Sequence, residues 1–156
     1  MIITNLIAQH LKQVYEGDNW TDVSIEASIK DIDWKQAQQQ TEASPNTIAS
    51  LIHHLLYWNG IIMQRMKGET PVIPAENGYD VPFLNSDEEW NVLKEKTHQS
   101  FKTLAEAIKN FPEEKLTGNY SPAIPSTYYR NFQGIIEHAH YHLGQIVVLK
   151  NLIEGA

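Results

Sequence analysis

The amino-acid sequence predicts an all-α fold, a four-helix bundle. Four long segments carry apolar residues at every third or fourth position, which is the period of an amphipathic helix. Residues that favour helix ends flank these segments, and no segment shows the alternation of apolar and polar residues that is typical of a β-strand. The chain has 156 residues, enough to bury one core, so we expect a single domain over residues 1–156.

The first long helix is predicted over roughly residues 2–16, because Gly17 follows in the position that a helix C-terminus prefers. His10 lies within its apolar stripe, so we expect this side chain to face the interior. The polar stretch 18–43 that follows predicts only a short helical turn or two. The residues of the stripe are Ile3, Leu6, Ile7, Leu11 and Val14.

The second long helix begins after Ser-Pro-Asn-Thr at positions 44–47, a sequence typical of a helix start, and Gly68 ends it. Residues 69–85 contain three prolines, Gly78 and no helical period, so they predict an extended connection of about 17 residues. Such a connection can cross a whole bundle, and the two helices that it joins can then run parallel. We therefore expect an up-down-down-up order with a long crossover between helices two and three.

The third long helix is predicted from residue 87 to about residue 110, because Ser86 and Glu89 have the spacing of a capping box. Three prolines and a glycine break the segment 112–125. Ser126 or Thr127 then caps the fourth long helix, which reaches nearly to the end of the chain.

The composition excludes several classes of function. Lys and Arg number 12 and Asp and Glu 19, and the resulting net charge of −7 repels a nucleic-acid backbone. The chain has no cysteine, so disulfides, thiolate zinc sites, iron–sulfur clusters and cysteine nucleophiles are excluded. No apolar run is long enough to span a membrane, and the N-terminal residues lack the basic start of a signal peptide. We expect a cytoplasmic protein with neither a nucleic-acid nor a membrane partner.

Three of the seven histidines form a candidate metal site. His138 and His142 are four residues apart in the last helix, so they stack on one face, at the flank of its apolar stripe. His54 has the same position on the second helix. The neighbouring His53 and His140 are predicted to turn outward. Three imidazoles can therefore converge between the two helices.

Histidines at the margin of a core are also common as plain hydrogen-bonded residues, and the pattern alone supports both interpretations about equally. Gln145 lies on the histidine side of the last helix, where it contacts either an imidazole or a side chain of another helix. Glu137 is interpreted as a solvated helical residue, and Gly144 as a site of close packing. The sequence assigns no catalytic acid or base.

The same residues carry a family resemblance. The last helix contains His138, His142, Gly144 and Gln145 in the pattern H-x-x-x-H-x-G-Q, and the second helix contains H-L-x-x-W from His54. Together with matching positions after the first helix and at the end of the second, these motifs resemble the DinB superfamily over most of the chain. The further matching positions are Gly17, Trp20, Ile48, Gly68, Gly134, Ile135, Ile136, Glu137, Tyr141, Leu143 and Ile146.

The resemblance implies a four-helix bundle in which His54, His138 and His142 bind a divalent metal, commonly zinc or nickel. Members with known activities are thiol S-transferases that use a low-molecular-weight thiol, and others are described as hydrolases. Three neutral imidazoles leave an open position, at which a metal can activate either a thiol for transfer or water for hydrolysis. His-only ligation also leaves iron and manganese open.

We therefore expect a metal-dependent enzyme that acts on a small electrophilic substrate, a thiol S-transferase or a hydrolase. The alternatives are a bundle that binds a metal or a small molecule without turnover, and a purely structural bundle. The resemblance and the frequency of two-fold symmetry predict a homodimer. Aromatic residues at 120–132 and the connection 71–83 offer apolar surface either for this interface or for a roof over the metal pocket.

Overall fold

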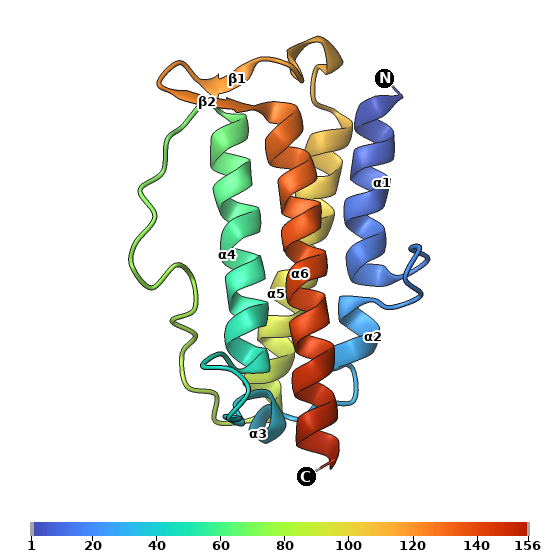
Figure 1. Ribbon diagram of the computed structural model, residues 1–156, viewed down its shortest axis with the longest axis vertical. Helices are drawn as coiled ribbons and strands as arrows, with labels where there is room; N and C mark the ends of the chain where they lie inside the picture. The colour runs from blue at the N-terminus through green and yellow to red at the C-terminus, as the bar shows by residue number, and fades with distance from the viewer. Residues whose placement is uncertain (1, 156) are drawn as a thin grey trace.

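The computed structural model describes residues 2–155 and consists mainly of four long helices. In Figure 1, α1 and α6 descend whereas α4 and α5 ascend, so the consecutive helices α4 and α5 are parallel. Two short helices, α2 and α3, precede α4, and a 3₁₀ turn follows α5. The bounds are α1 Ile3–Glu16, α2 Ile25–Ile29, α3 Trp34–Ala37, α4 Ile48–Met66, α5 Asp87–Lys109, the 3₁₀ turn Glu113–Lys115 and α6 Tyr128–Gly155. The predicted all-α, helical-bundle class is confirmed.

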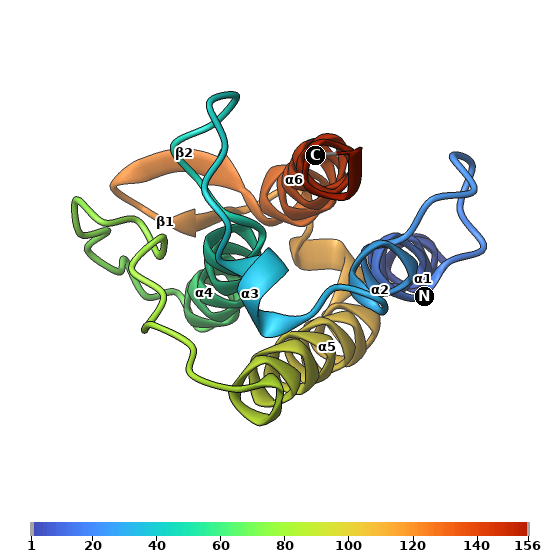
Figure 2. The ribbon, with the colours of Figure 1, turned by 90° about the horizontal axis from the view of Figure 1, so that it is seen from below.

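Figure 2 shows the four long helices around a common core, with α1 beside α5 and α6, and α4 beside α5 and α6. Each helix buries one apolar face, as its period predicts. The largest fully buried side chains are Trp90, Phe101, Phe132, Leu11, Ile25, Ile29, Ile48, Leu51, Ile52, Leu55, Leu104 and Ile108.

The helix ends follow the sequence signals closely. Thr47 and Ser50 form a reciprocal capping box at the start of α4, and the Thr127 hydroxyl accepts the Arg130 N–H at the start of α6. The predicted capping box of α5 is half correct. Ser86 accepts the N–H of Glu89, but the Glu89 carboxylate accepts the N–H of Asn85 instead, at 2.8 Å.

The structure also contains one small sheet that no sequence pattern indicates. Two short strands, β1 Asn119–Ser121 and β2 Ile124–Thr127, form an antiparallel hairpin before α6. Strands of three and four residues, with prolines at 122 and 125, are too short to show an alternating pattern. The hairpin places Ser126 beside the first turn of α6.

The connection between α4 and α5 runs beside α4 from one end of the bundle to the other (Figure 1). It bends at Asn77 and Gly78, which both have positive φ, at 51° and 77°. A Cβ atom at position 78 would lie 2.5 Å from Cγ of Tyr57 on α4. Only glycine therefore allows the connection to approach the helix this closely.

Two expectations about side-chain positions are wrong. His10 is exposed, because α1 buries a face rotated away from it that includes Thr4, Ala8 and Tyr15. Gly144 is exposed and packs against nothing. Among the aromatic residues at 120–132, Tyr120 and Phe132 are buried, Tyr128 is half-buried and Tyr129 is exposed. No helix within residues 2–155 is long and apolar enough to cross a membrane.

Candidate metal centre

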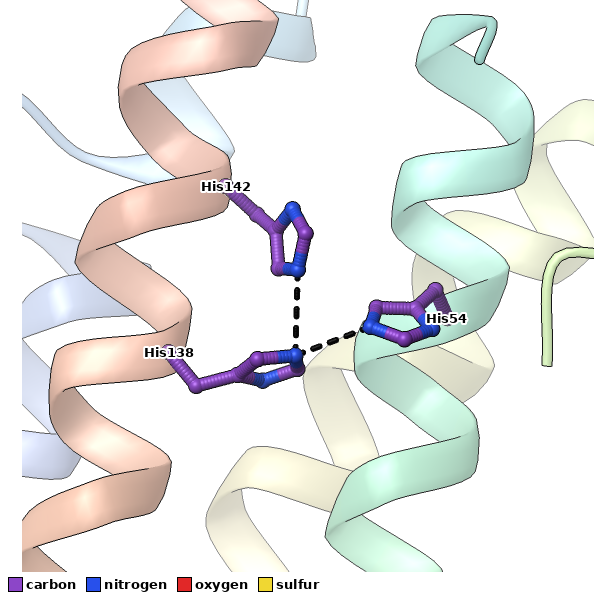
Figure 3. Close-up of side chains that lie close together, drawn as sticks. All are labelled: His54, His138 and His142. Atoms are coloured by element: carbon purple, nitrogen blue, oxygen red, sulfur yellow. Dashed lines mark hydrogen bonds between the residues drawn. The ribbon is translucent and has the colours of Figure 1, made fainter. Parts of the chain in front are cut away.

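The structure brings His54 of α4 together with His138 and His142 of α6 (Figure 3). The Nε2 atom of His138 lies 2.8 Å from Nε2 of His54 and 3.0 Å from Nε2 of His142. The three rings point toward one another from two neighbouring helices, as Figure 3 shows. His54 and His142 are buried, and His138 is half-buried.

Two of the rings are held by hydrogen bonds on their other nitrogen. Nδ1 of His54 is 2.6 Å from the backbone oxygen of Asn77, and Nδ1 of His142 is 2.6 Å from Oε1 of Gln145. A carbonyl oxygen only accepts, so both Nδ1 atoms donate, provided that the Gln145 amide is oriented with its oxygen toward the ring. The Nε2 atoms of His54 and His142 therefore present lone pairs to the centre of the cluster.

These tautomers make the cluster electron-rich. Nε2 of His138 can carry one hydrogen and share it with one neighbour, but it faces the lone pairs of both His54 and His142. At least one of the two short nitrogen–nitrogen contacts therefore has no hydrogen between its atoms, and two partially negative nitrogens repel each other there. A cation at the centre removes this repulsion, so the donor set fits a divalent metal ion.

The electrostatics of the site also suit metal binding. Burial lowers the pKa of His138 to about 3, and the neighbouring His142 and His54 add to this effect. Burial lowers the pKa of His54 to about 4, although its hydrogen bond to Asn77 acts in the opposite direction. Burial lowers the pKa of His142 as well, although its hydrogen bond to Gln145 acts in the opposite direction. All three imidazoles are therefore neutral at pH 7, the state in which histidine binds a metal.

The connection between α4 and α5 supports the His54 ring from outside. Tyr79 stacks on this ring with 3.9 Å between ring centres, and the indole N–H of Trp58 donates to Oδ1 of Asn77 at 3.1 Å. His53 is outside the cluster, since its Nδ1 lies 2.8 Å from the backbone oxygen of Gly78. Residues 77 and 78 thus bind two consecutive histidines of α4, of which only His54 faces the centre.

A cleft of about 460 Å³ opens beside the three histidines. One of its ends is formed by the histidines and two tyrosines, its middle by apolar side chains, and its other end by polar and cationic side chains. The lining residues beside the histidines are Asn77, Tyr79, Tyr141, Trp58, Ile62, Gly134, Ile135, Arg65, Ser126, Arg130 and Asn131.

A comparison with protein families finds one match, in which the model of the DinB superfamily covers residues 19–146. The chain belongs to the DinB superfamily. The matched range contains His54, His138 and His142 as well as both helices that carry them. No curated protein and no solved structure matches the chain. Membership in the DinB superfamily and the three-histidine cluster together fit a metal-binding protein.

Of the other residues considered in the sequence analysis, some contact the histidine cluster or the cleft and others lie away from both. Of the two roles considered for Gln145, the structure supports contact with a ligand imidazole, that of His142. Glu137 is exposed, and His140 faces His10 on the surface between α6 and α1. The connection 71–83 contributes to the wall of the cleft through Asn77 and Tyr79, as one of its two predicted roles required.

Sequence reasoning missed the support from the connection and the cationic end of the cleft. The dipeptide Asn77-Gly78 is a recognisable turn signal, but its sequence does not reveal which helix the turn contacts. Arg65 is near the end of α4, where a basic residue is common for reasons of helix polarity alone. Neither signal is specific enough to assign these residues to a site.

Proposed function

We propose that the protein is a metal-dependent thiol S-transferase whose divalent ion is held by His54, His138 and His142. A divalent ion at such a site lowers the pKa of a thiol or a water molecule and so supplies a nucleophile at neutral pH. Zinc and nickel are the ions that we favour, and the co-substrate is a low-molecular-weight thiol.

One observation favours thiol transfer over hydrolysis. Among residues 2–155, no Asp or Glu lines the cleft, and the three histidines carry depressed pKa values. Hydrolysis of most substrates needs a general base or acid near the reacting atoms. Transfer of a thiol that has already lost its proton needs none, so the available side chains are sufficient for it.

In the proposed reaction, the thiol sulfur forms a bond to an electrophilic carbon of the substrate, and the leaving group departs with the electron pair of the broken bond. The thiol proton is released to solvent. Tyr79 lines the cleft, and burial together with the neighbouring Tyr141 raises its pKa, so its hydroxyl stays protonated. A neutral hydroxyl here can donate a hydrogen bond to the substrate or to the leaving group. Trp58, Ile62 and Ile135 give the middle of the cleft an apolar lining.

The test begins with elemental analysis of tag-free protein, because a purification tag can itself carry nickel. We expect about one zinc or nickel ion per chain, and loss of that ion in His138→Ala. The metal-loaded protein is then incubated with 1-chloro-2,4-dinitrobenzene and glutathione, and formation of the thioether is followed by absorbance. Turnover that depends on both the metal and the thiol supports the proposal, whereas a metal-loaded protein without thiol-dependent turnover contradicts it.

The outcomes separate the alternatives. Metal-dependent hydrolysis of 4-nitrophenyl acetate without any need for thiol would favour the hydrolase. Bound metal with neither activity would favour a binding protein without turnover. Absence of metal from the tag-free protein, even after incubation with excess zinc and dialysis, would leave a structural bundle.

We also propose that the protein is a homodimer. The frequency of two-fold symmetry among soluble oligomers supports the proposal, and exposed apolar side chains lie on α1 and α6, at opposite ends of the bundle because both helices run in the same direction. The side chains are Ile3, Leu6, Val148 and Leu152. Light scattering at micromolar concentration tests it, and the mass of a monomer would contradict it.

A further inference from the structure

The end of the cleft remote from the histidines contains two arginines that the proposed chemistry does not use. Arg65 comes from the last turn of α4 and Arg130 from the first turn of α6. Within residues 2–155, neither guanidinium forms an ion pair with a carboxylate. The protein has a net charge of −7, yet no acidic side chain lines this cleft. The cleft is thus locally cationic on an acidic molecule.

Arg65 is held rigidly by contacts that leave most of its donors unused. Its guanidinium lies 5.5 Å from the ring centre of Trp58 and 5.1 Å from that of Tyr120, so both aromatic rings stabilise the cation. Nη1 donates to Oδ1 of Asn131 at 2.9 Å. Nε is buried and has no hydrogen-bond partner in the described chain. Nη2 is not enclosed in this way and has no partner in the described chain, so its N–H groups are the donors open to a ligand.

Asn131 and Ser126 complete this end of the cleft. The amide nitrogen of Asn131 donates to Oγ of Ser126 at 3.0 Å and to the backbone oxygen of Thr127 at 2.8 Å. These two bonds fix the orientation of the amide, so its oxygen faces Arg65. Ser126 accepts a hydrogen bond with its oxygen, and its own O–H has no acceptor in the described chain. A hydroxyl donor therefore lines the cleft close to the two guanidinium groups.

The spacing between the cationic end and the histidines is that of a small elongated molecule. Asn131 precedes His138 by seven residues, which is two turns of α6 or about 10 Å. Trp58 bridges the two ends, since its ring is 5.8 Å from that of His138 and also stacks on Arg65. The wall between them is apolar, formed by Ile62 and Ile135 with Trp58.

We propose that Arg65, Arg130 and Ser126 form a carboxylate-binding subsite, and that the protein acts on a ligand that reaches from this subsite to the three histidines. The inference rests on the proposed function for the histidine end of the cleft. The guanidinium fork and the hydroxyl are the donors that a carboxylate prefers, and an apolar spacer of several carbons fits the wall between the ends. The carboxylate belongs either to the thiol or to the electrophile.

The experiment measures ligand affinity by isothermal titration calorimetry on the zinc-loaded full chain. The probes are 6-mercaptohexanoate and its neutral analogue 6-mercapto-1-hexanol. We expect the carboxylate probe to bind about tenfold more tightly. Arg65→Gln should remove this preference and leave the affinity for the neutral thiol unchanged. Arg130→Gln should reduce the preference, and it keeps the test informative if the variant at position 65 does not fold.

Lys67→Gln is the matched control, because this substitution removes the same charge. Lys67 is exposed, is two residues from Arg65 in the sequence and lies outside the cleft. The preference for the carboxylate should survive in this variant. Equal losses in Arg65→Gln and Lys67→Gln would overturn the inference, since they would show only a general effect of charge. Equal affinity of the parent protein for both probes would also overturn it.

A second arm separates this inference from the proposed function. Binding of hexanoate to the metal-free protein is followed by NMR, and we expect Arg65→Gln to abolish it. Hexanoate binding to the metal-free protein does not depend on the metal. If the protein does not bind zinc, the proposed function is contradicted, but the subsite can still be tested. Repeating the arm on zinc-loaded protein saturated with 6-mercapto-1-hexanol identifies the source of the carboxylate. Continued binding of hexanoate assigns the carboxylate to the electrophile, and displacement of hexanoate assigns it to the thiol. A metal-free parent protein that does not bind hexanoate would contradict the subsite.

Discussion

The contact between α1 and α5 and the contact between α4 and α6 lie on opposite sides of the bundle, and they differ in chemistry (Figure 2). The first has an apolar interior, with Tyr15 packed against Phe101 at 5.0 Å between ring centres, and a polar outer margin where His98 contacts Glu16 at 3.1 Å. The second contains three histidines, two arginines and an asparagine beside the cleft. The comparison indicates that the α1–α5 side supplies more of the stability, whereas the α4–α6 side buries polar side chains around a cleft at a cost in apolar burial.

The largest effect is expected for a ligand histidine. His142→Ala should weaken zinc affinity by more than about 100-fold, because only two imidazoles remain, and should leave the bundle folded since the apolar core is untouched. Competition with a zinc chelator measures the affinity, and thermal melting measures the fold. His140→Ala on the same helix is the control and should behave as the parent protein does. An unfolded metal-free protein would show that the histidine site is needed for folding and would refute the separation of stability on the α1–α5 side from the site on the α4–α6 side.

The opposite side is tested by Phe101→Ala, which removes a fully buried ring from α5. We expect the free energy of unfolding to fall by about 3–5 kcal/mol, with zinc affinity of the folded protein unchanged. Urea denaturation measures the stability, and Val92→Ala at an exposed position of the same helix is the control. A large loss of zinc affinity in Phe101→Ala would show that the two sides are coupled.

Acid should destabilise the α4–α6 side selectively. The pKa values of about 4 for His54 and about 3 for His138 lie below the value near 6.5 of an unfolded chain. Between these limits the unfolded chain binds protons that the folded chain does not bind, so stability is fully present above about pH 6.5 and falls as the pH drops toward 4. Urea denaturation of metal-free protein across this range measures the effect. The free energy of unfolding should depend less steeply on pH in His138→Gln. An equally steep dependence in that variant would show that His138 is not a source of the acid sensitivity.

A smaller effect is expected for the residue that orients His142. Gln145→Leu removes the acceptor of its Nδ1–H, and loss of such an outer contact lowers metal affinity by about 10–100-fold. Chelator competition measures the change. Gln145→Glu keeps an acceptor and should retain most of the affinity. A variant Gln145→Leu with unchanged affinity would show that the ring is held by packing alone.

The smallest effect is expected at Gly144, next to Gln145 in the motif of the last helix. It is exposed, and a Cβ atom there would meet nothing within 4 Å. Gly144→Ala should therefore stabilise the protein by up to about 1 kcal/mol and leave zinc affinity unchanged. Thermal melting and chelator competition measure both quantities. A loss of stability would restore the sequence-based interpretation of this glycine as a packing site.

The sequence by itself determined the helices and the identity of the clustered histidines. The period of the apolar residues and the end signals at Thr47, Ser86 and Thr127 are local properties, so they can be recognised without knowledge of the fold. The spacing of four residues between His138 and His142 is also local, and the helical period places the consecutive residues His53 and His54 on different faces of their helix. The sequence did not predict the short hairpin before α6, because its strands are too short to show an alternating pattern.

Only the tertiary structure decided what surrounds the histidines. The contacts of Asn77 with His54 and of Arg65 with Asn131 join residues 23 and 66 positions apart in the sequence. Such pairs depend on the path of the connection and on the rotation of each helix, which a local pattern does not specify. His10 illustrates the same limit, because α1 has apolar residues on more than one face and the neighbouring helices select which face is buried. Local chemistry therefore decided which histidines meet, and packing between distant segments decided the cleft beside them.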